Sequence, residues 1–134
     1  MCIRDRSYTV QAAEPRPTPE MLAAATQPSG SEQFVRRYTA LPPLNPSVTD
    51  LVGRLTNAGQ TPYQRVMSIY DYFTDKANGF TYDLTTTPGT SGDQLADFLQ
   101  NKQGYCEQYA GAMGVLVRAA HVPCLLYTSP SPRD

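Results

Sequence analysis

The chain has 134 residues, about one domain, and its 11 Lys and Arg residues nearly balance its 12 Asp and Glu residues. Because the basic residues form no block, we expect no nucleic-acid partner. No apolar run is long enough to cross a membrane.

The two ends of the chain have sequences that are unlike those of an ordinary domain. The opening MCIRD and the closing CLLYTSPSPRD can be encoded by inverted copies of one short DNA sequence, which resembles the transposase adapter used in sequencing libraries. We therefore predict that residues 1–6 and 124–134 are adapter-derived, and we exclude them from fold reasoning. Cys106 is then the only cysteine to interpret, and residues 7–123 are expected to be a slice of a longer protein.

Residues 7–44 are predicted to be a linker with short helical turns. Residues 7–19 are rich in Pro, Ala and Thr and lack periodicity, so we expect little order there or in residues 124–134. Short helical turns are expected over residues 21–26 and 33–38. The prolines of residues 39–47 favour an extended connection.

Two amphipathic helices are predicted next. Ser47 is placed to cap the first, which should end near Gly59. Its apolar face holds Val48, Leu51, Val52 and Leu55. Thr61, Pro62 and Gln64 provide a cap, a first-turn proline and a capping box for the second. Its predicted buried residues, spaced i, i+3, i+4 and i+7, are Val66, Ile69, Tyr70 and Phe73.

A short strand and two further helices are predicted after these. Residues 79–83 alternate aromatic and polar side chains, as a strand does. Ser91 is expected to cap a short helix carrying Leu95, Phe98 and Leu99. The last helix should run from Tyr105 to about His121. Its apolar stripe comprises Cys106, Tyr109, Ala110, Met113, Leu116, Val117 and Ala120.

Cys106 falls in the first turn of that last helix. Helix N-termini carry unpaired backbone N–H groups and the positive end of the dipole, which favour a thiolate nucleophile. The same N–H groups can stabilise the oxyanion formed by attack on an amide carbonyl. The alternative is that Cys106 is a small buried hydrophobe of the core.

The string GYCEQYA (residues 104–110), with Asp93, residues 95–99 and residues 118–123, resembles the bacterial transglutaminase-like family. The resemblance covers about residues 45–123. It implies a papain-like α+β fold, of which this chain carries the mostly helical N-terminal half without the following β-sheet. It also implies that Cys106 is the nucleophile of a Cys-His-Asp triad. Such a triad performs acyl transfer or hydrolysis at amide bonds of a protein or peptide substrate, without a cofactor.

The histidine and aspartate of that triad are expected beyond Pro123, so the isolated chain should be inactive, although the resemblance implies that the longer protein is an enzyme. His121, the only histidine, lies about 22 Å along the helix from Cys106, beyond the reach of a general base. One Cys and one His at this spacing provide no metal site. Five aspartates are expected to be helix-surface, cap or loop groups: Asp71, Asp75, Asp83, Asp93 and Asp97.

Two other functions stay open. The chain could be a non-catalytic transglutaminase-like binding domain. It could also be a papain-like cysteine peptidase of another lineage, for which Gln100 or Gln103 would be the glutamine that precedes the cysteine. The resemblance further implies a longer protein embedded in a membrane through segments outside this chain, with this domain outside the cytoplasm.

Overall fold

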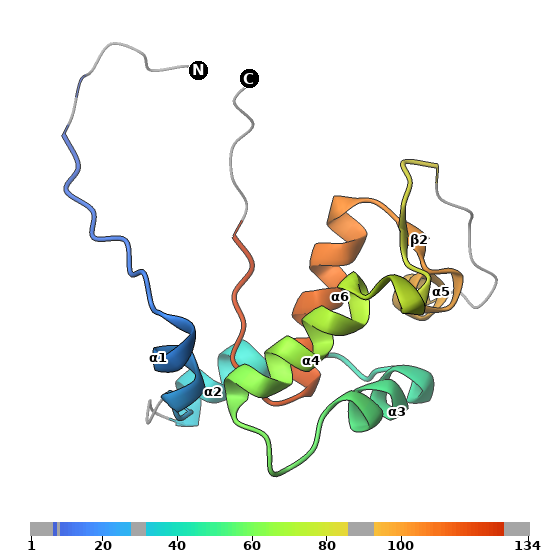
Figure 1. Cartoon of the computed structure of the whole chain (residues 1–134), viewed down its shortest axis with the longest axis horizontal. Helices are drawn as coiled ribbons and strands as arrows, with labels where there is room; N and C mark the ends of the chain where they lie inside the picture. Colours follow the sequence, from blue (N-terminus) through green and yellow to red (C-terminus); the bar gives the residue numbers. More distant parts are fainter. Residues whose placement is uncertain (1–6, 8, 28–31, 86–92, 128–134) are drawn as a thin grey trace.

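The structure, a computed structural model, describes residues 7, 9–27, 32–85 and 93–127. These residues are mostly helical and contain one small parallel sheet (Figure 1). The elements in chain order are α1 (Pro19–Ala24), α2 (Glu32–Thr39), α3 (Pro46–Leu55), α4 (Pro62–Thr74), the 3-10 helix η1 (Lys76–Asn78), β1 (Thr81–Tyr82), α5 (Gln94–Asn101), β2 (Gln103–Gly104) and α6 (Cys106–Ala119). The mostly helical character predicted for the chain is confirmed.

Helices α4 and α6 form the centre of the fold, and α3 and α5 pack against them. Ile69 of α4 and Leu116 of α6 have no exposed surface. The buried apolar residues form one cluster: Val48, Leu51, Val52, Ile69, Phe98, Leu99, Ala112, Leu116, Val117 and Ala120. Because α6 supplies three of these residues and Ala120 directly follows it, its position is fixed by the core rather than by its own helix propensity.

Helix α3 buries the predicted face but begins and ends elsewhere than predicted. Its N-cap is Asn45, whose Oδ1 accepts a hydrogen bond of 3.0 Å from the backbone N–H of Ser47. Ser47 is therefore not the cap. The helix ends at Leu55 instead of near Gly59, because Thr56 has an extended backbone.

Helix α4 begins with the predicted capping box. The Thr61 hydroxyl accepts a 3.3 Å hydrogen bond from the Gln64 backbone N–H, and the Gln64 side chain accepts one of 2.9 Å from the Thr61 N–H. The prediction for its buried face is wrong at Tyr70, which is 51% exposed. Tyr72 packs inward instead, with its ring 5.1 Å from that of Phe80.

Replacing Thr61 with alanine should lower the free energy of unfolding by about 1 kcal/mol, because the first turn of a central helix loses its side-chain cap. Urea unfolding followed by circular dichroism measures the change. Thr74→Ala is the matched control, since Thr74 is exposed at the other end of α4. An equal loss of stability in both variants would contradict the importance of the cap.

The predicted strand over residues 79–83 is present as the shorter β1, and its partner β2 was not predicted. Thr81 pairs with Gln103, and Tyr82 pairs with Gly104, in a parallel arrangement. Lys102, with a left-handed backbone (φ 56°), ends α5 and turns the chain into β2. The sheet therefore joins the segment after α4 to the residues just before Cys106.

Helix α5 confirms the predicted core positions Phe98 and Leu99, which are both buried. Its N-cap is Asp93 rather than the predicted Ser91, which itself lies outside the described residues. Asp93 Oδ1 accepts hydrogen bonds from the backbone N–H groups of Leu95 (3.1 Å) and Ala96 (3.2 Å). Asp97 was expected at a surface, cap or loop and is buried.

The two ends of the chain are described only in part. Residues 1–6 and 128–134, parts of the predicted adapter-derived ends, lie outside the described residues. The short helical turns predicted for residues 7–44 are present as α1 and α2. The backbone N–H of Cys124 donates to the Tyr38 carbonyl at 3.0 Å. The adapter origin of the ends stays a prediction.

In the part of the chain that the structure describes, no helix is both long and apolar enough to span a membrane.

Candidate active site at the start of helix α6

Cys106 is the first residue of α6 and carries a free, exposed thiol. The prediction that it extends the buried stripe of this helix is therefore wrong. The buried positions of α6 begin at Ala112, and the neighbouring prediction for Ala110 is also wrong because that residue is exposed. No described element covers the start of the helix over the sulfur, so the thiol is open to a substrate.

Two backbone N–H groups at the start of α6 have no hydrogen-bond partner among the residues that the structure describes. The N-cap residue Tyr105 provides no side-chain cap hydrogen bond. Among the described residues, no hydrogen bond is made by the N–H groups of Cys106 and Glu107, which are the first two of the helix. The thiol therefore lies beside two free donors and the positive end of the helix dipole, an arrangement that stabilises a thiolate or an oxyanion.

The peptide unit between Gly104 and Tyr105 is held on both sides. Its carbonyl oxygen accepts a 2.8 Å hydrogen bond from the Asp83 backbone N–H. Its N–H donates to the Gln108 side-chain oxygen at 3.1 Å. This peptide unit directly precedes Cys106, so it fixes the direction in which the chain enters α6.

Gly104 is buried where no larger residue fits. A Cβ atom at this position would come within 2.8 Å of the Phe98 ring and would also meet the Gln108 side chain that bonds Tyr105. Real Cβ atoms do not approach other atoms so closely. The glycine therefore lets α5 and the start of α6 come together.

An aromatic cluster packs against the first turns of α6 through Tyr109. The rings of Phe73, Phe80, Phe98 and Tyr109 contact one another, and the Tyr109 ring centroid is 5.1 Å from that of Phe98. The Tyr109 hydroxyl donates a 2.9 Å hydrogen bond to the Thr81 carbonyl, which ties α6 to β1. Burial raises the pKa of Tyr109, so the hydroxyl remains a donor at neutral pH.

Asp83 connects β1 to β2 through its side chain. One carboxylate oxygen accepts a 2.7 Å hydrogen bond from the Thr85 backbone N–H, and the other accepts one of 2.7 Å from the Gln103 amide. These hydrogen bonds hold the pKa of the Asp83 carboxyl below its ordinary 3.8. Because the pKa falls on folding, the carboxylate stabilises the fold above pH 3.8, and that contribution is lost as the pH falls through the lowered pKa.

His121 lies at the opposite end of α6 from Cys106. It adopts a left-handed backbone conformation (φ 61°) just after the helix, and its N–H donates to the Arg118 carbonyl at 2.9 Å. Its own carbonyl accepts a 2.7 Å hydrogen bond from the Gln27 side chain. The residue terminates the helix, and the described residues bring no histidine to the thiol.

The candidate aspartates serve local structure. Asp75 caps η1 by accepting a 2.9 Å hydrogen bond from Ala77, and Asp71 is exposed on α4. The described residues contain no group of three or more His, Cys, Asp or Glu side chains that could hold a metal ion.

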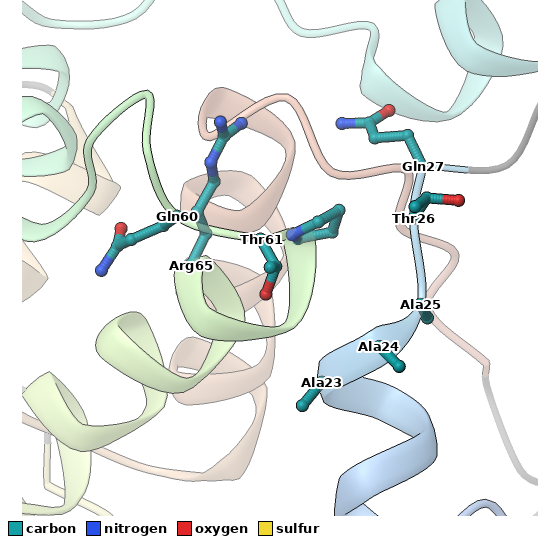
Figure 2. A pocket seen from close by; sticks show the side chains of 9 residues that line it. Ala23, Ala24, Ala25, Thr26, Gln27, Gln60, Thr61 and Arg65 are labelled. Carbon is teal, nitrogen blue, oxygen red and sulfur yellow. The ribbon is translucent and has the colours of Figure 1, made fainter.

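A cavity of about 290 Å³ lies between α1 and the start of α4 (Figure 2). Arg65 lines it and donates a 3.1 Å hydrogen bond to the Ala120 carbonyl at the end of α6. The remaining lining residues are Ala23, Ala24, Ala25, Thr26, Gln27, Gln60, Thr61 and Pro62. The cavity therefore lies at the end of α6 away from Cys106 and is no part of the thiol site.

Comparison with known protein families gives a match to the transglutaminase-like superfamily over residues 49–132. The chain belongs to this superfamily. The match includes Cys106 and the whole of α4 to α6. The α+β fold class and the resemblance carried by the GYCEQYA string are thereby confirmed.

Two curated bacterial proteins are similar to this transglutaminase-like chain. The uncharacterized protein YebA of Bacillus subtilis is 32% identical over 87% of the chain. A protein-glutamine gamma-glutamyltransferase of Pseudomonas aeruginosa is 35% identical over 59% of the chain. The chain spans only 16% and 12% of the lengths of these relatives. No solved structure matches the chain significantly.

Sequence reasoning missed three features of the site. These are the link between Asp83 and Gln103, the crowding at Gly104 and the hydroxyl bond of Tyr109. The sequence did carry a signal for the first feature. Asp83 comes at the end of the predicted strand, and Gln103 lies shortly before the cysteine helix. Asp83 and Gln103 are 20 residues apart and form no local pattern, so only the fold brings them together.

Proposed function

We propose that Cys106 is the nucleophile of an acyl-transfer reaction at amide groups of a protein or peptide substrate. The observation that carries this proposal is the exposed thiol at the first position of α6, beside two N–H groups that have no partner in the described part of the chain. Membership of the transglutaminase-like superfamily supports it.

The reaction proceeds in two steps. The thiolate of Cys106 attacks the amide carbonyl carbon, and the oxyanion that forms faces the free N–H groups of the first turn. The C–N bond then breaks, and the leaving nitrogen takes a proton and departs as ammonia or an amine. An amine or water attacks the resulting thioester, restores the thiol and gives the new amide or the acid.

A histidine and an aspartate from outside these 134 residues complete the triad. His121 is the only histidine of the chain, and its place beyond the far end of α6 prevents contact with the thiol. Without a base near the sulfur, the isolated chain lacks a group to protonate the leaving nitrogen. We propose that the chain works as part of a longer polypeptide, anchored in a membrane with this domain outside the cytoplasm.

The name of the Pseudomonas aeruginosa relative favours the glutamine side-chain amide as the acyl donor. A papain-like peptidase mechanism is less favoured, because the Gln103 amide nitrogen donates to Asp83 at 2.7 Å and to the Thr85 carbonyl at 3.5 Å, which occupies both of its N–H donors. Gln100 is exposed on α5 rather than placed on β2 next to the thiol.

The proposal is tested on the extended protein, meaning this chain expressed with the coding sequence that adjoins it in its genome. It is incubated with a glutamine-containing protein and a fluorescent primary amine, and the products are identified by mass spectrometry. We expect amine incorporation that iodoacetamide abolishes by alkylating Cys106. Cleavage of peptide bonds with no amine incorporation would indicate a peptidase, and absence of both reactions would indicate a binding domain.

A further inference from the structure

Besides the pairing of β1 with β2, the segment that leads into Cys106 is held by Asp83, the residue directly after β1. Asp83 makes two hydrogen bonds to β2. Its carboxylate accepts one of 2.7 Å from the Gln103 side-chain amide, and its backbone N–H donates one of 2.8 Å to the Gly104 carbonyl. Its other carboxylate oxygen accepts the Thr85 N–H, which orients the carboxylate toward Gln103. Both contacts fall within three residues of the thiol.

These contacts act on the peptide unit before the N-cap. The Gly104 carbonyl that Asp83 binds belongs to the same peptide unit as the Tyr105 N–H, which donates to Gln108. Rotation of this unit would break both hydrogen bonds together. The next two N–H groups along the chain are the free donors of Cys106 and Glu107, so their direction depends on this unit.

We propose that Asp83 is a positioning residue for Cys106, acting through Gln103 and Gly104. The inference rests on the proposed role of Cys106 as a nucleophile. Asp83 does not touch the reacting atoms. It keeps the first turn of α6 closed, so that the free N–H groups point together at the sulfur and at a bound oxyanion.

Charge and hydrogen bonding at Asp83 can be separated with two variants. Asp83→Asn removes the charge, but its amide still accepts from Thr85 and donates to a Gln103 side chain turned by 180°. Asp83→Ala removes the same charge and both side-chain hydrogen bonds. The two variants therefore differ in hydrogen bonding alone, and Gln103→Ala breaks the same link with the Asp83 charge retained.

The test is the rate of iodoacetamide alkylation of Cys106 in the 134-residue chain between pH 6 and 10, followed by peptide mass spectrometry. Asp83→Ala should label about two- to fivefold more slowly than Asp83→Asn near neutral pH, the size of a helix N-terminus effect on a thiolate. Its pH profile should move to higher pH. Gln103→Ala, with its fold checked by circular dichroism, should label more slowly than wild type.

Asp75→Ala is the matched control. It removes a carboxylate that accepts a backbone N–H two residues on, as Asp83 does, but it lies at η1 away from β2. It should label as the wild type does. Equal profiles for Asp83→Ala and Asp83→Asn, or an equal loss in Asp75→Ala, would overturn the proposal. The two proposals can fail separately. If Cys106 is no nucleophile, the extended protein transfers no acyl group even when the labelling rates follow the expected order.

Discussion

Replacing Cys106 with alanine should abolish acyl transfer by the extended protein, with kcat/KM lower by about a thousandfold or more. The reason is chemical, since the covalent thioester cannot form without the sulfur. Cys106→Ser should lose a similar amount because the hydroxyl is a far weaker nucleophile at neutral pH. Amine incorporation into a glutamine-containing protein measures both variants.

The same substitution should leave stability almost unchanged. The Cys106 side chain is exposed, so its removal leaves no cavity in the core. The melting temperatures of wild type, Cys106→Ala and Cys106→Ser should therefore agree. Thr49→Ala, at an exposed position of α3, is the control that should keep full activity. Activity retained in Cys106→Ala would rule out the nucleophile, and a large drop in its melting temperature would assign the residue to the core.

Replacing Leu116 with alanine should lower the free energy of unfolding by about 2–5 kcal/mol. Leu116 has no exposed surface and lies in the one core cluster where α3, α4, α5 and α6 meet. Removal of its side chain loses apolar burial and leaves a cavity that tightly packed neighbours fill poorly. Urea unfolding followed by circular dichroism gives the change.

Leu84→Ala is the matched control for this prediction. Leu84 is 77% exposed, so the same chemical change should cost less than about 0.5 kcal/mol. A loss at Leu116 no greater than the loss at Leu84 would contradict the assignment of α6 as the centre of the core.

The features of the fold that depend on local sequence could be predicted. The Thr61 capping box and the spacing of Val48, Leu51 and Val52 are properties of neighbouring residues, and both are present in the structure. The end of α3 was placed too far along the chain, because Thr56 and the residues after it carry no apolar spacing that marks the last turn.

The features that depend on contacts between distant segments could not be predicted. A two-residue strand such as β2 has no alternation to detect, and its partner lies about 20 residues earlier. Tyr70 lies four residues after Val66 and three before Phe73, a spacing that predicts burial, but it is Tyr72 that contacts the rings of Phe73 and Phe80. Asp97 lies beside Phe98 on α5, and the sequence gives no sign that its own position is also covered.

The prediction for Cys106 was half right for the same reason. Its place at the start of a helix follows from the sequence, and so does the availability of the first N–H groups. Its burial was inferred from the apolar stripe of α6, but a stripe does not tell how far along the helix neighbouring elements extend. Tyr109 packs against the core and full burial begins at Ala112, so the stripe is covered from there on while Cys106 and Ala110 are exposed.

The most direct test of the account is to trap the acyl group on Cys106. The extended protein is mixed with a glutamine-containing peptide, quenched with acid before an amine is added, and digested for mass spectrometry. The account predicts that the peptide containing Cys106 gains the mass of the donor peptide minus ammonia, and that hydroxylamine at neutral pH removes the addition, as expected for a thioester. An acyl group found on another residue, or turnover with Cys106 unmodified throughout, would contradict the assignment of Cys106 as the nucleophile.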